Sequence, residues 1–274
     1  MFGVGSLGEL IVKLSNLESI KLHYRTLGEG PPLIILHGVF GSSDNWQTLG
    51  KALSATHKVF LVDLRNHGKS PHSQEFNYAV MAEDVLELLQ DAEVPQANVL
   101  GHSMGGKVAM TLATAYPEVV DKLIVVDIAP KQYPPHHQQI FAGFKSVSLS
   151  EIKSRGEADQ QMMKVIANAG IRQFILKNLD RDEQKGFKWK LNLAAIEAGA
   201  SQVGAGLSNS AVFNGETLFV SGGNSDYIKT EDHALIYHHF ANAKIETISG
   251  AGHWVHAEKP KDLLETLHQF LNAD

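Results

Sequence analysis

Residues 101–105 have the types and spacing that surround the nucleophilic serine of many hydrolytic enzymes. Gly101-His102-Ser103-Met104-Gly105 follows a short apolar run, and an alanine-rich helical pattern begins directly after it. A sharp turn from a strand into a helix presents such a serine hydroxyl at the carboxyl end of the strand, and the flanking glycines let the two elements approach each other. Free amides at a helix N-terminus favour a developing negative charge. The pattern therefore predicts that Ser103 is a nucleophile.

A serine hydroxyl is a weak nucleophile at neutral pH and needs an adjacent base. We expect this base to be His253, which lies between the last predicted strand and the last predicted helix, after Ser103 in the chain. His256 is the alternative, and we interpret it instead as a hydrogen-bonding loop residue. The histidine pairs at 136–137 and 238–239 have no carboxylates at ligand spacing, so we interpret them as solvated positions and expect no metal site.

Two aspartates are candidates for the acid that orients the base. Counted from Gly222, which ends a predicted strand, the common Gly-x-x-Asp spacing falls on Ser225, and Asp226 comes one residue late. Asp127 ends a different apolar run, at the same carboxyl edge of the predicted sheet as Ser103. An aspartate at position 127 also suits an ordinary turn. We favour Asp127 and keep Asp226 as the alternative.

Acyl transfer also needs backbone N–H groups that are fixed before the reaction and stabilise the oxyanion. The amide of Met104, directly after the predicted nucleophile, is the first expected donor. The second is expected from the loop that begins at His37-Gly38, where another apolar run ends.

These residues need a scaffold, and apolar runs of strand length alternate with helical patterns along most of the chain. Strands are expected at residues 33–36, 59–62, 97–100, 123–126, 218–221 and 244–248, with two more within 10–26; helices are expected at 44–53, 77–92, 104–116, near 230–240 and from residue 260. This alternation predicts an α/β fold in which helices cover both faces of a mostly parallel sheet.

The alternation is interrupted at residues 131–210, which have an irregular helical pattern. We expect a core of residues 1–130 and 211–274 and an inserted helical cap of residues 131–210. The aromatic and apolar residues of this cap line an acyl pocket or, as we favour, form the core of the cap itself: Phe141, Phe144, Ile171, Phe174 and Trp189. Arg65 and His67 face the site or, as we favour, belong to a turn at 63–70 held by its own polar groups.

Composition narrows the function classes further. The 274 residues are 43% hydrophobic and carry a formal charge of −6 without a basic cluster, which argues against nucleic acid as a partner. The absence of cysteine excludes disulfides and thiolate sites. The first ten residues lack the basic and apolar regions of a signal peptide, and no apolar stretch approaches the roughly 18 residues of a membrane span. We therefore expect a cytoplasmic protein with no membrane span.

Six blocks in order resemble the α/β-hydrolase superfamily and, within it, the YbfF-type bacterial esterases. They are His37-Gly38-Val39-Phe40-Gly41-Ser42, Arg65-Asn66-His67-Gly68, residues 101–107, Asp127-Ile128-Ala129-Pro130, Gly222-Gly223-Asn224-Ser225 and residues 250–260.

The resemblance is weakest in the cap, where substrate choice lies. It implies an α/β-hydrolase fold and a serine esterase that acts on small-molecule acyl esters of short to medium length, and on acyl thioesters as a further class, without a cofactor. By similarity, the second oxyanion donor is the amide of Val39, with the amide of Phe40 as the next choice; Phe40 also contacts substrate, and the acid is Asp127. Carbon–carbon bond hydrolysis or perhydrolysis by the same residues, or ligand binding with little turnover, are the alternatives.

Overall fold

The computed structural model describes residues 19–135, 137–182 and 186–273, and seven of its strands form one sheet in the order β1-β3-β2-β4-β5-β8-β9. These are β1 (Tyr24–Leu27), β2 (Pro32–Leu36), β3 (Lys58–Val62), β4 (Ala97–His102), β5 (Val120–Val126), β8 (Glu216–Gly222) and β9 (Ala243–Ile248). β1 runs antiparallel to β3, and the other neighbours are parallel. The predicted α/β architecture is confirmed. The first ten residues and the strand expected near residues 10–15 lie outside the described ranges.

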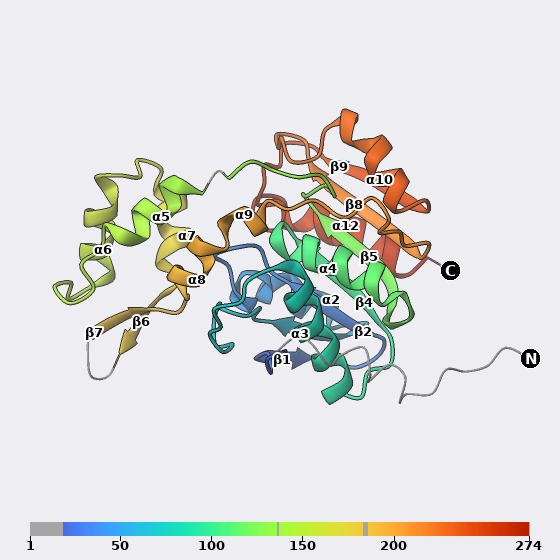
Figure 1. The fold of residues 1–274 in the computed structure, drawn as a ribbon, viewed down its shortest axis with the longest axis horizontal. Coiled ribbons are helices and arrows are strands. Elements are labelled where there is room, and N and C mark those ends of the chain that lie inside the picture. The colour runs from blue at the N-terminus through green and yellow to red at the C-terminus, as the bar shows by residue number, and fades with distance from the viewer. Residues whose placement is uncertain (1–18, 136, 183–185, 274) are drawn as a thin grey trace, which may run out of the picture.

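Helices cover both faces of the sheet (Figure 1). They are η1 (Ser43–Trp46), α2 (Gln47–Leu53), α3 (Tyr78–Asp91), α4 (Met104–Ala115), η2 (Pro117–Val119), η3 (Thr230–Asp232), α10 (His233–His239), α11 (Val255–Glu258) and α12 (Pro260–Leu271). Alternate side chains of a strand point to opposite faces. Leu33 and Ile35 of β2 accordingly join a buried cluster with α2 and α12, whereas Ile34 and Leu36 join another with α3 and α4. Burial on both faces explains why this strand is a continuous apolar run.

The chain between β5 and β8 forms an insertion that projects from the core as a separate lobe (Figure 1). It contains α5 (Gln138–Lys145), α6 (Arg155–Met163), α7 (Ala169–Leu176), β6 (Leu179–Asp182), β7 (Gly186–Trp189), α8 (Leu193–Ala198) and α9 (Ala200–Val203). The predicted helical insertion is present, but the antiparallel pair β6–β7 was missed. These strands bury only Leu179 and Phe187, and charged residues at 180–182 mask the alternation that identifies a strand. The division of the chain at residues 131 and 210 stays a prediction.

A buried lysine joins α4 to both segments that connect the insertion to the core. The ammonium Nζ of Lys107 donates hydrogen bonds to the carbonyl oxygens of Lys131, at 2.5 Å, and Ala205, at 2.8 Å. The two segments also pair directly, since the amide of Leu207 donates to the carbonyl of Pro130 at 2.9 Å. The start and the end of the insertion are therefore held beside the helix that follows Ser103.

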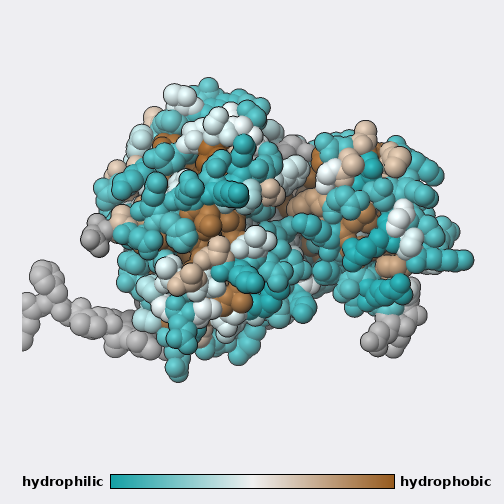
Figure 2. All heavy atoms as spheres, turned by 180° about the vertical axis from the view of Figure 1, so that it is seen from behind, coloured by the Kyte–Doolittle hydropathy of each residue, from teal (hydrophilic) through white to brown (hydrophobic). Residues whose placement is uncertain are grey.

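Figure 2 shows hydrophilic side chains over most of the rear face, with smaller apolar patches on the core and on the side of the insertion that is turned toward the core. None of the helices in the described ranges has the length and apolar character needed to cross a membrane.

Candidate active site

Ser103 lies in the strained turn between β4 and α4. Its backbone has φ 53° and ψ −117°, a conformation that a residue with a side chain rarely adopts. A Cβ atom on Gly101 would lie 2.1 Å from the carbonyl oxygen of Gly105, and one on Gly105 would lie 2.4 Å from that of Leu36. The two glycines are therefore required by the close approach of strand and helix, as the spacing predicts. The turn presents the Ser103 hydroxyl at the carboxyl edge of the sheet.

Folding brings the predicted base and one predicted acid to this hydroxyl. Nε2 of His253 lies 3.1 Å from Oγ of Ser103, and its Nδ1 lies 2.8 Å from Oδ2 of Asp127. An ionised carboxylate only accepts hydrogen bonds, so Nδ1 carries the imidazole proton and Nε2 directs its lone pair at the serine. In this arrangement the imidazole is able to take the proton of Ser103.

The carboxylate of Asp127 is fully buried and held from several sides. Its Oδ1 accepts the amide of Gly222 at 2.9 Å, and its Oδ2 accepts the hydroxyl of Ser225 at 2.5 Å. The alternative acid, Asp226, has a side chain that is 93% exposed and lies 3.4 Å from the ammonium of Lys229. Ser225, on which the Gly-x-x-Asp spacing falls, thus donates its hydroxyl to Asp127, whereas Asp226 faces solvent.

The loop after β2 lies beside Ser103. A Cβ atom on Gly38 would lie 3.3 Å from the Cβ of Ser103, so this loop approaches the nucleophile closely. Of the two amides expected as the second oxyanion donor, that of Phe40 already donates to Nε2 of His67 at 3.2 Å. The amide of Met104 is the first of α4 and has no acceptor within the helix.

Comparison with known proteins identifies the family of this chain. The family model described as alpha/beta hydrolase fold matches residues 31–146. The chain is 38% identical over 268 residues to the sn-1-specific diacylglycerol lipase ABHD11 of Mus musculus, covering 94% of this chain and 87% of that protein. It is 36% identical over 242 residues to esterase YbfF of Escherichia coli, covering 88% and 93% of the two chains. The chain belongs to the alpha/beta hydrolase superfamily.

The solved structure of a marine microorganism esterase supports the same assignment. It matches this hydrolase with a TM-score of 0.90 at 42% sequence identity, covering 92% of this chain and 100% of that one. The resemblance to YbfF-type esterases is therefore confirmed, and the chain is a hydrolase of the esterase and lipase type.

The candidate active site of this hydrolase opens into a cavity of about 210 Å³. Its walls are mainly aromatic and imidazole side chains, with the glycine-rich loop on one side: Gly38, Val39, Phe40, Gly41, Asn45, Trp46, His102, Ser103, His137, Ile140, Phe174, Tyr227, His253, Trp254 and His256. The ring of Tyr227 stacks on that of His253, with centroids 3.8 Å apart and planes 16° apart.

Of the five cap residues considered as lining of an acyl pocket, Phe174 alone lines this cavity, together with His137 and Ile140 of the insertion. Phe174 lines the cavity and contacts Trp254, with ring centroids 5.7 Å apart. Phe141 and Phe144 are buried and pack against Phe40 instead, at 5.2 and 5.6 Å. The interpretation of these two residues as cap core is therefore right in part, because their contacts extend to the core loop.

His256 is not the hydrogen-bonding loop residue that the sequence suggested. It lies in α11, is buried, and stacks on Trp46 with ring centroids 4.7 Å apart. Its Nδ1 has no hydrogen-bond partner in the described part of the chain. Burial lowers the pKa of its imidazole to about 3. His256 therefore forms part of the cavity wall as a neutral aromatic ring.

Two other histidines also differ from the prediction of solvated positions. His137 lies against Phe40, with ring centroids 5.5 Å apart, and lines the cavity. His239 is buried, with Nδ1 2.6 Å from the carbonyl of Ala211, whereas His238 is exposed as expected. Position 136 lies outside the described residues. Over the ranges that are described, no three potential metal ligands come together. Periodicity alone does not distinguish a buried histidine from a solvated one.

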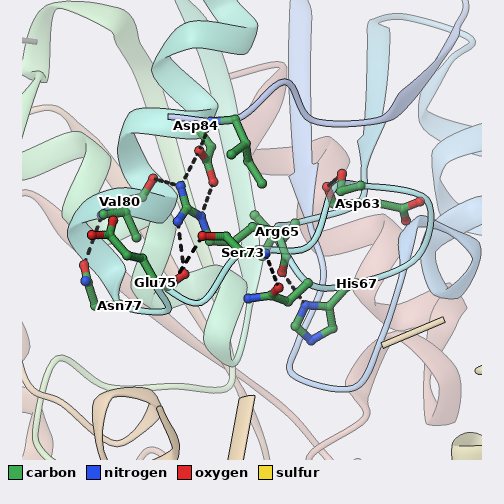
Figure 3. Close-up of polar contacts among 12 residues, drawn as sticks. Asp63, Arg65, His67, Ser73, Glu75, Asn77, Val80 and Asp84 are labelled. Atoms are coloured by element: carbon green, nitrogen blue, oxygen red, sulfur yellow. Dashed lines mark hydrogen bonds and ion pairs between the residues drawn. The ribbon is translucent and has the colours of Figure 1, made fainter. Parts of the chain in front are cut away.

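The segment at residues 63–70 is only partly held by its own polar groups. Ser70 Oγ donates to the carbonyl of Asp63 at 2.5 Å, and the amide of Lys69 donates to the Asp63 carboxylate at 3.0 Å. Arg65 and His67, however, are fully buried. Arg65 binds Asp84 of α3 (Figure 3), and Nε2 of His67 accepts a hydrogen bond from the amide of Phe40. Their contacts were missed because their partners are distant in sequence.

Proposed function

We propose that this hydrolase is a serine esterase that cleaves short to medium acyl esters through an acyl-enzyme. The observation that carries the proposal is the connected series Ser103–His253–Asp127, which ends at a cavity with aromatic walls. The esterase and lipase names of the relatives support the same reaction class.

In the proposed mechanism, Oγ of Ser103 attacks the ester carbonyl as its proton passes to Nε2 of His253. The amides of Val39 and Met104 stabilise the oxyanion of the tetrahedral intermediate, and Asp127 stabilises the imidazolium. The intermediate collapses, and the imidazolium returns the proton to the departing alcohol. Water then hydrolyses the acyl-enzyme with His253 as the base, which releases the carboxylic acid and restores Ser103.

Initial rates on p-nitrophenyl esters of increasing acyl length test this proposal, with Ser103→Ala as the blank. We expect turnover of short and medium esters by the wild type, no turnover above background by Ser103→Ala, and no loss of activity with EDTA. A medium-chain acyl thioester and a diacylglycerol extend the panel. Activity that EDTA abolishes and zinc restores would contradict the mechanism, as would full activity of Ser103→Ala.

The alternative reactions use the same residues but give different kinetics. A rapid burst without steady turnover on activated esters would favour a ligand-binding protein with little turnover. Faster cleavage of a vinylogous β-diketone than of any ester would favour carbon–carbon bond hydrolysis. If, in the presence of hydrogen peroxide, the rate of peracid formation exceeds the rate of ester hydrolysis, perhydrolysis would be favoured.

The choice of acyl length is expected to depend on Phe174. Phe174→Ala enlarges the cavity next to Trp254, so the preferred acyl chain should become longer by several methylene groups. Phe187→Ala is the matched control, because this residue is also a buried phenylalanine of the insertion and does not line the cavity. Rates across the ester series measure both. The same preference in Phe174→Ala and the wild type, with folding intact, would mean that this wall does not limit chain length.

A further inference from the structure

The backbone of Phe40 is strained at a place where precision matters for the proposed reaction. Its φ is 61°, in the left-handed region that bulky side chains rarely adopt. Phe40 directly follows Val39, whose amide is the second oxyanion donor in the proposed mechanism. A strained conformation persists only when surrounding contacts impose it. The contacts that fix the peptide groups on either side of Phe40 therefore influence the position of the Val39 amide.

His67 holds the first of these peptide groups. The amide of Phe40 donates to Nε2 of His67 at 3.2 Å, and Nδ1 of His67 lies 2.8 Å from the carbonyl oxygen of Arg65. A carbonyl oxygen only accepts, so Nδ1 carries the proton and Nε2 is free to accept from Phe40. His67 is fully buried, and burial lowers the pKa of its imidazole to about 3. The ring therefore stays neutral in the one tautomer that binds both partners.

Arg65 in turn fixes the segment that carries His67. Its Nε and one terminal nitrogen donate to the two carboxylate oxygens of Asp84 in α3, at 2.6 and 2.7 Å (Figure 3). The other terminal nitrogen donates to the carbonyl of Glu75 at 3.0 Å. Both charged side chains are fully buried. A paired, planar guanidinium of this kind permits little movement of the backbone at residue 65.

A second histidine joins the same two loops with the same tautomer. Nε2 of His37 accepts the amide of Leu64 at 3.0 Å, and its Nδ1 lies 2.8 Å from the carbonyl of Gly38. The rings of His37 and His67 pack with centroids 5.0 Å apart. The loop after β2 and the loop after β3 are therefore connected by two neutral imidazoles.

The insertion holds the other peptide group of Phe40. The side-chain amide of Asn178, between α7 and β6, donates to the carbonyl oxygen of Phe40 at 2.8 Å in a buried contact. The amide of Asn192 donates to the carbonyl of Asn66 at 3.0 Å, next to His67. The core thus binds the amide of Phe40, and the insertion binds its carbonyl oxygen.

We propose that His67 is a positioning residue of the oxyanion hole. By accepting the amide of Phe40, it holds the Val39–Phe40 peptide in the strained orientation and leaves the Val39 amide available for the oxyanion. Asn178 completes the arrangement by binding the Phe40 carbonyl. This inference rests on the proposed function, and it gives a role to Arg65-Asn66-His67-Gly68, which the mechanism does not use.

The comparison of His67→Leu with His67→Gln tests the proposal. Leucine removes the acceptor in a similar volume, whereas the side-chain oxygen of glutamine is able to take the place of Nε2. Loss of an oxyanion contact acts on the transition state, so kcat should fall while KM stays nearly constant. We expect His67→Leu to lower kcat by about 10- to 100-fold, less than deletion of a donor, and His67→Gln to recover most of it.

Inhibition by a trifluoromethyl ketone supplies a second readout, because its hemiketal oxyanion occupies the same donors. Its Ki should rise with His67→Leu by about the factor by which kcat falls. His239→Leu is the matched control: it also removes a buried histidine bound to a backbone carbonyl, but in α10, and should leave kcat and Ki unchanged. Thermal unfolding of each variant reports its folding.

An unchanged kcat and Ki in folded His67→Leu would overturn the proposal, as would a loss that His67→Gln does not recover. If His67→Leu fails to fold, Asn178→Leu decides, because it releases Phe40 from the insertion side and should also lower kcat at constant KM. Wild type and Ser103→Ala are measured alongside. Active wild type with inactive Ser103→Ala supports the esterase, so a negative result at His67 then contradicts the positioning role alone.

Discussion

The carboxylate of Asp127 has no contact with solvent, and its two oxygens have different hydrogen-bond partners. Oδ2 faces the imidazole of His253 and the hydroxyl of Ser225, and Oδ1 is occupied by the amide of Gly222. The side chain therefore has little freedom to turn, and it holds His253 with Nδ1 as the donor. In the proposed mechanism, Asp127 therefore sets the tautomer of the base, while the stacked ring of Tyr227 also contacts His253.

Replacement of this carboxylate by the amide of the same shape tests its role. Asp127→Asn presents a donor or a weaker acceptor to His253, which disturbs the tautomer and removes the charge that stabilises the imidazolium. In serine proteases with a Ser-His-Asp triad, the equivalent change from aspartate to asparagine lowers kcat by about 10⁴-fold. We expect a loss of about 100-fold or more in kcat with KM nearly unchanged, measured on a p-nitrophenyl ester.

The matched control is Asp226→Asn in the same assay. The Asp226 side chain is 93% exposed, so this variant should stay within about tenfold of the wild type. Circular dichroism shows whether both variants fold. The opposite pattern, a disabled Asp226→Asn and an active Asp127→Asn, would transfer the role to the residue after β8.

At the scale of elements, α3 carries two acidic residues with different partners. Asp84 forms a fully buried pair with Arg65 and also accepts the amide of Ile20 at 2.7 Å. Asp91, two turns later, forms a pair with Lys21 at 3.1 Å in which both side chains are at least half exposed. The buried pair attaches the loop after β3 to α3, whereas the exposed pair lies in water and is screened.

These two pairs predict different losses of stability. Asp84→Asn leaves the guanidinium of Arg65 buried without a counter-charge, so the free energy of unfolding should fall by about 3–5 kcal/mol. Asp91→Asn should cost less than about 1 kcal/mol, because an exposed pair contributes little. Urea unfolding followed by circular dichroism measures both changes. Equal losses would mean that the buried pair does not anchor this loop.

At the scale of the whole molecule, several buried histidines lie in and around the candidate active site. Burial lowers the pKa of His37, His67, His102 and His256, with His67 and His256 near 3. In the unfolded chain the same rings titrate near pH 6.5. Between pH 6.5 and pH 3 the unfolded chain therefore binds more protons than the folded one. The free energy of unfolding should fall as the pH drops through this window.

His256→Phe isolates one of these contributions, because phenylalanine keeps the stack on Trp46 and does not titrate. A histidine that stays neutral in the folded protein lowers the free energy of unfolding by about 2 kcal/mol at pH 5, since each pKa unit corresponds to about 1.4 kcal/mol. Between pH 8 and pH 5, the free energy of unfolding measured in urea should therefore fall by about 2 kcal/mol less for His256→Phe than for the wild type.

His238→Gln controls for the removal of any histidine, because this residue is exposed on α10. It should leave the pH dependence of stability unchanged. If His256→Phe and the wild type lose the same free energy between pH 8 and pH 5, burial of His256 does not contribute to acid sensitivity.

Local pattern was sufficient to predict the sheet, its flanking helices and the place of Ser103. The nucleophile turn is encoded within residues 97–110, because the strand, the glycines and the helix are contiguous. The β/α alternation likewise reflects burial of each strand on both faces, which a run of four or five apolar residues records. The sequence also placed His253 in the loop before the last helices.

The tertiary structure decided which aspartate meets the base and how the remaining polar residues are used. Asp127 and His253 are 126 positions apart, and no periodicity reports such a contact. The same holds for Asn178 at Phe40, 138 positions away, and for the burial of His256. A local pattern encodes which face of an element is apolar. The pairing of single polar groups depends on how the loops at the edge of the sheet fold against one another, and this is determined only when the whole chain packs.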